Sequence, residues 1–320
     1  MASAHLARRH PAASADKTVT GTEGDDLLRG TDKDDLLDGG AGDDTLRGGL
    51  GDDTYVVDSA GDVIKERPGE GWDVVQAWTS YQLGGRLEEL RLMGSGDLAG
   101  IGNAKGNLIV GNAGHNWLEG RAGRDTLQGG EGHDQLWGGT GRDLLDGGQG
   151  NDVLDGGAGD DSLLGGEGDD LLYAGDGADT LVGGEGWDRV SAYLGDATAA
   201  LTVDLRQPLA GQVGAHQLQE VEAINLSTGS GDDTVHTGSW GSDDYISTGA
   251  GNDWIELGSS HVWGWGNVYA GEGDDTLLGG SGTDINLFGE AGNDSIDGGA
   301  GNDALTDGAG DDTLVGGTGD

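Results

Sequence analysis

The chain contains no cysteine, only three prolines and a single phenylalanine. Without cysteine no disulfide can stabilise the fold, and the redox state of its compartment cannot be inferred. The scarcity of proline excludes a collagen-like triple helix, which requires frequent proline and a glycine at every third residue. No stretch approaches the roughly 18 consecutive apolar residues of a transmembrane helix, so we expect no membrane insertion.

Basic residues are also scarce, with 16 lysines and arginines against 59 acidic residues and a formal net charge of -43. A surface of this charge repels nucleic-acid phosphates and anionic membranes, so neither is expected as a partner. Cations are the natural ligands. A chain this acidic, with 70 glycines, is either disordered or a repeat protein loaded with metal. The order of the residues decides between these two classes.

A nine-residue unit recurs in tandem, without insertion, from Gly111 to Ser191. Glycine dominates positions one, two and four of this unit, aspartate holds position six, and a large apolar residue holds position eight, as in GGTGRDLLD and GGAGDDSLL. An earlier run opens at Gly21, and a third run with broken phase extends from Thr228 to Asp320. A fixed period of this kind indicates a stacked repeat architecture.

The repeats and the segments between them suggest six regions. We expect a disordered leader at 1–20, where Arg8 and Arg9 are not followed by the apolar core of a conventional signal peptide. The three repeat blocks are 21–56, 102–191 and 228–320, and the last ends within a repeat, which favours a truncated block or a fragment of a longer protein. Two β-rich spacers, 57–101 and 192–227, are interpreted as broader solenoid rungs or caps, with a ligand-binding insert as the alternative.

The physical properties of the unit predict its shape. Glycine at this density excludes a helix, because each glycine costs about 1 kcal/mol relative to alanine there. Glycine permits positive φ, so positions one to four form a turn, and positions seven to nine form a short strand with only position eight pointing inward. Two nine-residue units then complete one coil. Each unit lies on the unit two places further along the chain, and their strands are separated by about 4.8 Å. The expected fold is all-β: a parallel β-roll, or β-solenoid, with a thin leucine core. In the middle block that core comprises Leu118, Leu127, Leu136, Leu145, Leu154, Leu163, Leu172, Leu181 and Val190.

The position-six aspartates would line each edge of this solenoid as a column of like charges, which a cation must neutralise. Calcium takes six to eight oxygen ligands from carboxylates and carbonyls, whereas zinc and copper favour cysteine or histidine, and magnesium wants a tighter octahedron. The sequence therefore predicts multiple bound Ca2+ ions, on the order of a dozen. The candidate ligands are Asp26, Asp35, Asp44, Asp53, Asp125, Asp134, Asp143, Asp152, Asp161, Asp170, Asp179, Asp188, Asp233, Asp244, Asp253, Asp275, Asp284, Asp294, Asp303 and Asp312.

Burial of one leucine per unit contributes roughly 1.5–3 kcal/mol, while ordering nine residues costs roughly 9–18 kcal/mol in backbone entropy. Hydrogen bonds between strands recover only part of this difference. We therefore expect the metal-free chain to be largely disordered and calcium binding to supply folding free energy.

The unit resembles the calcium-binding nonapeptide G-G-x-G-x-D-x-U-x of RTX, or hemolysin-type, proteins across most of 21–320. The resemblance implies a secreted, extracellular bacterial protein that leaves the cell by type I secretion and folds on meeting calcium. It also implies that the position-six aspartates and turn carbonyls bind the metal. Asn107 and Asn116 depart from the pattern at position six, so weak or absent sites are expected there. Asn286 stands where leucine is expected, and Phe288 then adds one residue to the phase.

No catalytic constellation is found, so the chain is predicted not to be an enzyme. None of the seven histidines lies in H-E-x-x-H, and no G-x-S-x-G is present. His115 and His133 occupy position five of units two apart and could face each other, but exposed polar variation is the favoured interpretation.

Two other roles remain open. The chain could be the calcium-dependent module of a larger secreted enzyme or toxin, such as a protease, lipase, epimerase or cytolysin, or it could be an adhesin or surface-layer spacer. Aromatic residues cluster in the third block, where they could bind a glycan or mediate self-association, although core packing or edge capping is favoured. These residues are Trp240, Trp254, Trp263 and Trp265.

Overall fold

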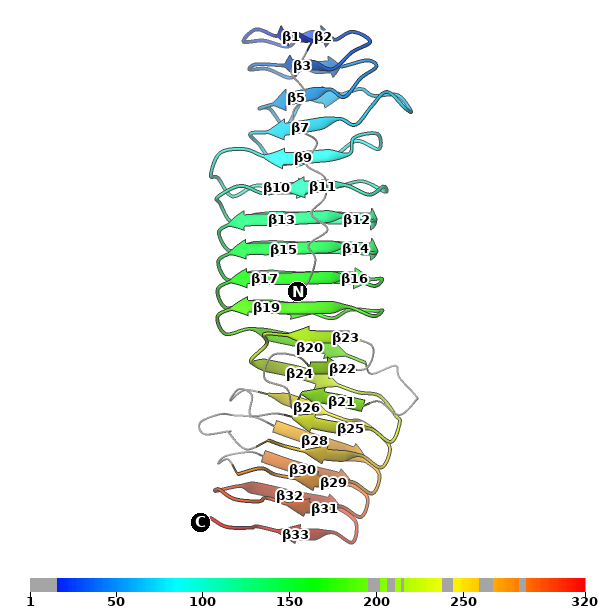
Figure 1. Cartoon of the computed structure of the whole chain (residues 1–320), viewed down its shortest axis with the longest axis vertical. Helices are drawn as coiled ribbons and strands as arrows, with labels where there is room; N and C mark the ends of the chain where they lie inside the picture. Colours follow the sequence, from blue (N-terminus) through cyan, green and yellow to red (C-terminus); the bar gives the residue numbers. More distant parts are fainter. Residues whose placement is uncertain are drawn as a thin grey trace. The chain divides into compact units, whose positions relative to one another are not determined.

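The computed structural model describes residues 16–194, 202–205, 211–213, 216–237, 244–258, 267–281 and 286–319. Their regular structure consists of β-strands, which divide between two compact units, 1–162 and 163–320. Within each unit nearly all strand pairs are parallel and successive rungs stack on one another (Figure 1). The prediction of an all-β parallel solenoid is confirmed. Among the described residues, no helix is long and apolar enough to cross a membrane.

The strands of the first unit are short and follow one another at each half-coil. They are β1 (Lys17–Thr20), β2 (Leu27–Arg29), β3 (Asp35–Asp38), β4 (Thr45–Arg47), β5 (Thr54–Val57), β6 (Val63–Ile64), β7 (Val74–Ala77), β8 (Tyr81–Gln82), β9 (Glu89–Leu92), β10 (Ala99–Ile101), β11 (Leu108–Val110), β12 (Trp117–Gly123), β13 (Thr126–Glu131), β14 (Gln135–Gly141), β15 (Leu144–Gln149) and β16 (Val153–Ala158). The odd-numbered strands from β1 to β15 form one parallel sheet, and the even-numbered strands form two others, β2–β4–β6 and β8–β10–β12–β14–β16.

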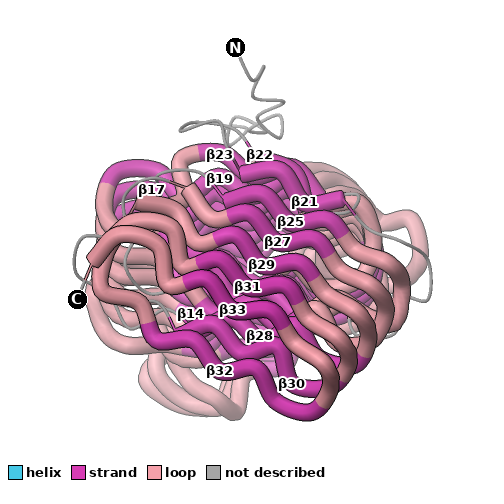
Figure 2. Tube along the Cα trace, turned by 90° about the horizontal axis from the view of Figure 1, so that it is seen from below, coloured by secondary structure: helices cyan, strands magenta, loops and turns pink. Residues whose placement is uncertain are grey.

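The second unit repeats this alternation. Its strands are β17 (Ser162–Glu167), β18 (Leu171–Tyr173), β19 (Thr180–Glu185), β20 (Arg189–Tyr193), β21 (Thr202–Leu205), β22 (Gly211–Val213), β23 (His216–Gln219), β24 (Ala223–Ser227), β25 (Thr234–Thr237), β26 (Tyr245–Ser247), β27 (Trp254–Glu256), β28 (Asn267–Glu272), β29 (Thr276–Leu278), β30 (Asn286–Ala291), β31 (Ser295–Asp297), β32 (Ala304–Ala309) and β33 (Thr313–Val315). Strands β25, β27, β29, β31 and β33 lie side by side on one face, and β28, β30 and β32 lie on the other (Figure 2). β22 pairs antiparallel with both β21 and β23.

The register confirms that two consecutive nine-residue repeats make one coil. Leu127 pairs with Leu145, and Leu136 pairs with Leu154 on the opposite sheet. All nine position-eight residues of the middle block are buried at 0–1% exposure, so the core is one apolar side chain thick on each side. Their neighbours at positions seven and nine are more exposed, except Ser191, as the period of a strand requires.

Two glycine positions of the unit depend on the absence of a side chain. Gly132, at position four, has a φ of +121°, and a Cβ atom there would lie 2.5 Å from the carbonyl oxygen of Gly114 in the neighbouring turn. A Cβ atom on Gly129, at position one, would lie 2.3 Å from Oδ2 of Asp134 in the same unit. The glycine at position four allows neighbouring turns to stack closely. The glycine at position one leaves room for the carboxylate of position six.

The structure adds three details to the sequence-based expectations. β1 begins inside the segment expected as a leader, and its Lys17 pairs with Asp35 of β3. Several strands of the middle block continue past position nine into the next turn, as β13 does, where Gly130 and Glu131 pair with Gly148 and Gln149. The core position near Asn286 is filled by Leu287, which pairs with Val268 and is 1% exposed. The prediction that Asn286 replaces the core leucine is therefore wrong, since the phase shift precedes it.

The core geometry makes a direct prediction. Leu127→Ala should destabilise the calcium-saturated protein by about 2–5 kcal/mol, because it opens a cavity in a core only one leucine deep. Leu144→Ala, a change of the same size at outward-facing position seven, should cost less than about 1 kcal/mol. Thermal unfolding followed by circular dichroism measures both, and equal losses would contradict the assignment of inward and outward positions.

Candidate metal site

The position-six aspartates form two hydrogen-bonded columns, one along each edge of the solenoid. On one edge of the first unit, Oδ1 of Asp143 accepts a 2.7 Å hydrogen bond from the backbone N–H of Asp125, and Oδ1 of Asp161 accepts one from Asp143. On the other edge, Oδ1 of Asp152 accepts from Asp134 at 2.7 Å. Each carboxylate therefore bridges two turns that are 18 residues apart along the chain.

The second unit contains the same ladder with longer rungs. Asp233 donates its backbone N–H to Asp253, and Asp253 donates to Asp275, at 2.8 Å each. Asp275 donates in turn to Asp294 at 3.0 Å. The broken phase of the third block therefore does not break its column of aspartates, because insertions are accommodated elsewhere in the rung.

Most of the predicted ligands are almost completely buried. The buried ones are Asp35, Asp44, Asp53, Asp125, Asp134, Asp143, Asp152, Asp161, Asp170, Asp179, Asp188, Asp233, Asp244, Asp253, Asp275 and Asp294. Asp26, Asp303 and Asp312 are partly exposed, and Asp284 lies outside the described residues.

The second carboxylate oxygen is the unusual feature of these turns. Oδ2 of Asp125, Asp134 and Asp143 is buried, and no described residue donates a hydrogen bond to it. A buried carboxylate oxygen without a donor is strongly unfavourable unless a proton or a cation compensates its charge. These oxygens are therefore the part of the turn that fits a metal ion.

Carboxylates alone do not complete a metal site. Within the described part of the chain, no three histidine, aspartate or glutamate side chains gather where they could hold one ion. A hard cation bound in these turns would therefore need further oxygen ligands, such as backbone carbonyls and water, which calcium accepts readily.

Two asparagine-containing turns show that the fold can aim carbonyls at one positive group. Nδ2 of Asn103 donates to the carbonyl oxygens of Gly84 and Leu87 at 2.9 and 2.8 Å. Nδ2 of Asn112 donates in the same way to Met93 and Gly96, at 3.2 and 3.0 Å. In each case two carbonyls from one neighbouring turn converge on the partly positive end of an amide.

The asparagines at position six belong to these same turns. Oδ1 of Asn107 accepts from the N–H of Asn103 at 2.8 Å, and its Nδ2 donates to the carbonyl of Leu87 at 3.1 Å. Oδ1 of Asn116 accepts from the N–H of Asn112 at 2.7 Å, and its Nδ2 donates back to Oδ1 of Asn112 at 3.0 Å. An amide carries both a donor and an acceptor, so these turns satisfy themselves without a cation.

Burial makes the ionised aspartates costly. It raises the pKa of Asp125 and Asp134 to about 6, although the backbone hydrogen bond to each carboxylate works in the opposite direction. It raises the pKa of Asp53 and Asp275 further, to about 7, where neighbouring aspartates add their repulsion. Without metal, these carboxyl groups therefore stay protonated to a higher pH than ordinary aspartates do. A bound cation would favour the ionised form.

The sequence analysis missed members of both columns in the first unit. Asp62 accepts from the backbone N–H of Asp44 at 2.9 Å, and Asp73 accepts from Asp53 at 3.0 Å. Both lie in the segment interpreted as a spacer. The signal was present in GWDVV around Asp73, which has the same Asp–x–apolar spacing as GWDRV around Asp188.

Two further residues cap aspartates of the second unit. His216 lies 2.9 Å from Oδ2 of Asp179 through its Nδ1 atom, and Glu222 accepts from the backbone N–H of Asp188 at 2.8 Å. They occupy the places that position-six aspartates fill elsewhere. Only the folded rung identifies them, because neither residue is part of a nonapeptide.

Position five carries a second ladder that the sequence pattern did not reveal. Nδ1 of His115 accepts from the backbone N–H of His133 at 2.6 Å, and Nδ1 of His133 accepts from Asn151 at 2.7 Å. The two rings stack with centroids 5.0 Å apart. In the first block, Asp25 accepts from Asp43 in the same way at 2.9 Å. The histidines do face each other, and they are exposed acceptors with a structural role.

The pKa shifts predict how the metal-free chain responds to pH. Folded-state pKa values of about 6 to 7 lie above the ordinary value of 3.8, so the folded chain binds more protons than the unfolded chain between these values. Proton binding thus stabilises the fold fully below pH of about 4, and this contribution disappears as the pH rises through about 6 to 7.

In chelator, β-sheet content measured by circular dichroism should therefore increase as the pH is lowered from 8 to about 4. With calcium present the trend should reverse, because protons and metal compete for the same oxygens. A metal-free chain whose β-sheet signal falls on acidification would show that the buried aspartates do not control its stability.

The sequence matches the family of RTX calcium-binding nonapeptide repeats (4 copies) over residues 20–55, 101–136, 128–163, 137–172, 164–199, 240–261, 264–285 and 287–320. No curated protein matches the chain. The matched segments cover most of the chain and include every position-six aspartate named above except Asp233. The chain belongs to the RTX calcium-binding nonapeptide repeat family.

Proposed function

We propose that the chain binds Ca2+ ions in its turns, through the position-six aspartates together with turn carbonyls. The observation that carries this proposal is the buried Oδ2 atom of Asp125, Asp134 and Asp143, which has no donor among the described residues. The candidate ligands named from the sequence, with Asp62 and Asp73 added, are proposed to share this role. The number of candidate aspartates supports on the order of a dozen ions.

Calcium binding is further proposed to drive folding. The core is one leucine thick on each side, while the turns concentrate buried carboxyl groups whose ionisation opposes the fold at neutral pH. A cation removes that repulsion and ties two turns of one column together, so the binding free energy becomes folding free energy. Folding would then follow the calcium concentration of the surroundings.

The biological setting proposed is extracellular, after type I secretion, where calcium is available to a chain exported unfolded. The chain is proposed to act as a non-catalytic scaffold. It can serve as the calcium-dependent module of a larger secreted enzyme or toxin, or as an adhesin or surface-layer spacer. Trp254, on β27, is 43% exposed and could contact a glycan or another copy, whereas Trp240, Trp263 and Trp265 lie outside the described residues.

A calcium titration tests the central proposal. Adding Ca2+ to chelator-treated protein at neutral pH should produce a cooperative gain of β-sheet signal, and Mg2+ should produce little, because it prefers a smaller octahedron with retained waters. A chain that is already folded in chelator would contradict calcium-coupled folding, even if it bound the ion.

The role of the aspartate columns is tested by paired variants. Asp143→Asn keeps the acceptor for the N–H of Asp125 but removes a charge, and should reduce bound calcium by about one or two ions per chain. Asp146→Asn makes the same change at position nine, on the outer strand face, and should leave the stoichiometry unchanged. Calorimetry and metal analysis of the dialysed protein give the count, and equal losses in both variants would argue against site-specific binding.

The asparagine turns allow a gain-of-function test. The double change Asn112→Gly and Asn116→Asp turns GNAGHNWLE into GGAGHDWLE, which matches the repeat pattern. It removes the amide that holds the Met93 and Gly96 carbonyls and supplies a carboxylate, so bound calcium should increase by about one ion per chain. Asn151→Asp, at position five, is the control. An unchanged count in the double variant would mean that those turns cannot form a site.

A further inference from the structure

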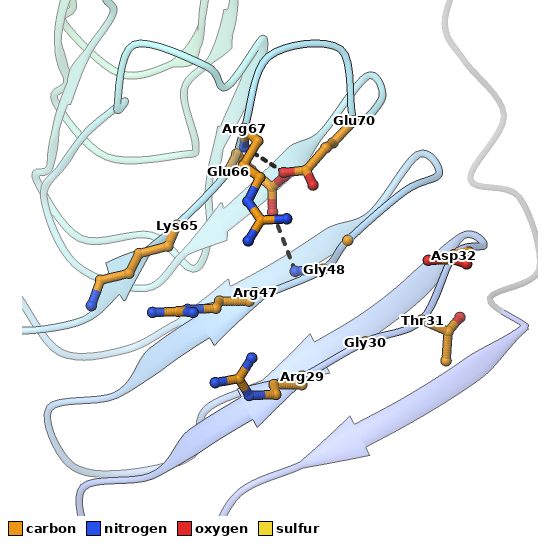
Figure 3. A pocket seen from close by; sticks show the side chains of 11 residues that line it. Arg29, Gly30, Thr31, Asp32, Arg47, Gly48, Lys65, Glu66, Arg67 and Glu70 are labelled. Carbon is orange, nitrogen blue, oxygen red and sulfur yellow. Dashed lines mark hydrogen bonds between the residues drawn. The ribbon is translucent and has the colours of Figure 1, made fainter.

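A cluster of basic residues lies in the first unit of this strongly acidic chain. Arg29, Arg47, Lys65 and Arg67 line a cavity of about 400 Å3, together with residues of the adjoining turns (Figure 3). The whole chain has only 16 lysines and arginines, so four at one place is a marked concentration. A cavity of this size suits a small ligand.

Three of these cations are stacked directly above one another. Arg29 of β2 pairs in register with Arg47 of β4, and the backbone N–H of Lys65, just after β6, continues the ladder to the carbonyl of Leu46 at 2.9 Å. Figure 3 shows their side chains on three successive rungs. Parallel neighbours lie about 4.8 Å apart, and like charges facing each other at that distance destabilise a sheet.

Within the part of the chain that the structure describes, no ion pair offsets this repulsion. Among the described residues, none of the four side chains forms an ion pair, and Nε of Arg47 is buried without a hydrogen-bond acceptor. Two acidic residues of the cavity accept from groups other than these cations: Oε1 of Glu66 from the Tyr55 hydroxyl and the N–H of Gly48, and Glu70 from the N–H of Arg67. Oε2 of Glu66 is buried without a donor among the described residues. The cations are therefore left available to an external anion.

We propose that this cavity binds an acidic oligosaccharide, with its carboxylate groups on the ladder of Arg29, Arg47 and Lys65. Guanidinium groups hold carboxylates through paired hydrogen bonds, and Arg47 at the centre has an unused donor. Thr31, Asp32 and Glu70, which also line the cavity, offer acceptors to sugar hydroxyl groups. The ligand thus needs both negative charges repeated at about the strand spacing and hydroxyl groups beside them.

Other anions fit less well. A single inorganic ion cannot reach three cations that span about 10 Å, which is twice the strand spacing. A long nucleic acid would extend past the cavity and meet the acidic remainder of the chain, whose net charge is -43. An oligosaccharide of about three residues covers the ladder and ends within the cavity. This site goes beyond the proposed calcium binding, which uses none of the four basic side chains.

The test is calorimetric titration of the calcium-saturated full chain with a 1,4-linked uronate trisaccharide at low ionic strength. We expect binding that weakens with added salt. Arg47→Gln should weaken it at least about tenfold, since a charge-assisted pair is lost. Arg86→Gln, an exposed arginine outside the cavity, carries the same charge change and should bind as the unchanged protein does. Lys65→Gln provides a second variant at the edge of the ladder.

The calcium-induced β-sheet signal of each variant shows that it folds, which separates this result from any failure of calcium binding. A neutral trisaccharide should not bind. Citrate and pyrophosphate provide small multivalent anions without a sugar ring, and equal affinity for them would overturn the carbohydrate assignment. Equal losses in the Arg47 and Arg86 variants, or no uronate binding to the unchanged protein, would overturn the site itself.

Discussion

The fold depends on one interaction, the bridge that each position-six carboxylate makes between two stacked turns. Oδ1 of Asp143 satisfies the backbone N–H of Asp125, while its Oδ2 remains buried with no donor among the described residues. Oδ1 sets the spacing of the rungs, and the buried Oδ2 is unfavourable unless a positive charge or a proton compensates it. Because both come from one side chain, the residue that sets the register of the solenoid is also the one proposed to bind the cation.

The arrangement explains why the unit tolerates so little variation. Glycine predominates at position one because the carboxylate occupies the space of a Cβ atom, as at Gly129 beside Asp134. It predominates at position four because the neighbouring turn places a carbonyl there, as at Gly132. The apolar residue at position eight fills the core, as the leucines of the middle block and Tyr55 of the first block do. Positions three, seven and nine face outward, and these are the positions at which charge, aromatic rings and the basic ladder vary.

Sequence reasoning predicted the coil, the inward leucines and the two columns because each depends on a strict local period. It failed where the period is interrupted but the stack continues. Asp73 keeps its place in the column although its rung is longer than those of the nonapeptides, and His216 occupies a column position without any motif. Pairing across rungs, not spacing along the chain, decides which residues meet there. The position-five ladder was missed for a different reason, since aspartate, asparagine and histidine look unrelated until their common acceptor role is seen.

The asparagine turns show what the aspartate turns require. Asn103 and Asn112 direct amide N–H groups at pairs of carbonyls, and Asn107 and Asn116 present an acceptor without a charge. The same backbone is therefore completed by an amide within the chain at these turns, and by the proposed cation at the aspartate turns. An amide is always present, whereas a cation binds only at sufficient concentration. Under the proposed calcium binding, the segment around 102–119 completes its turns with amides of the chain, whereas the aspartate turns beyond it would take up metal. Folding would then spread outward from that segment as calcium fills the neighbouring columns.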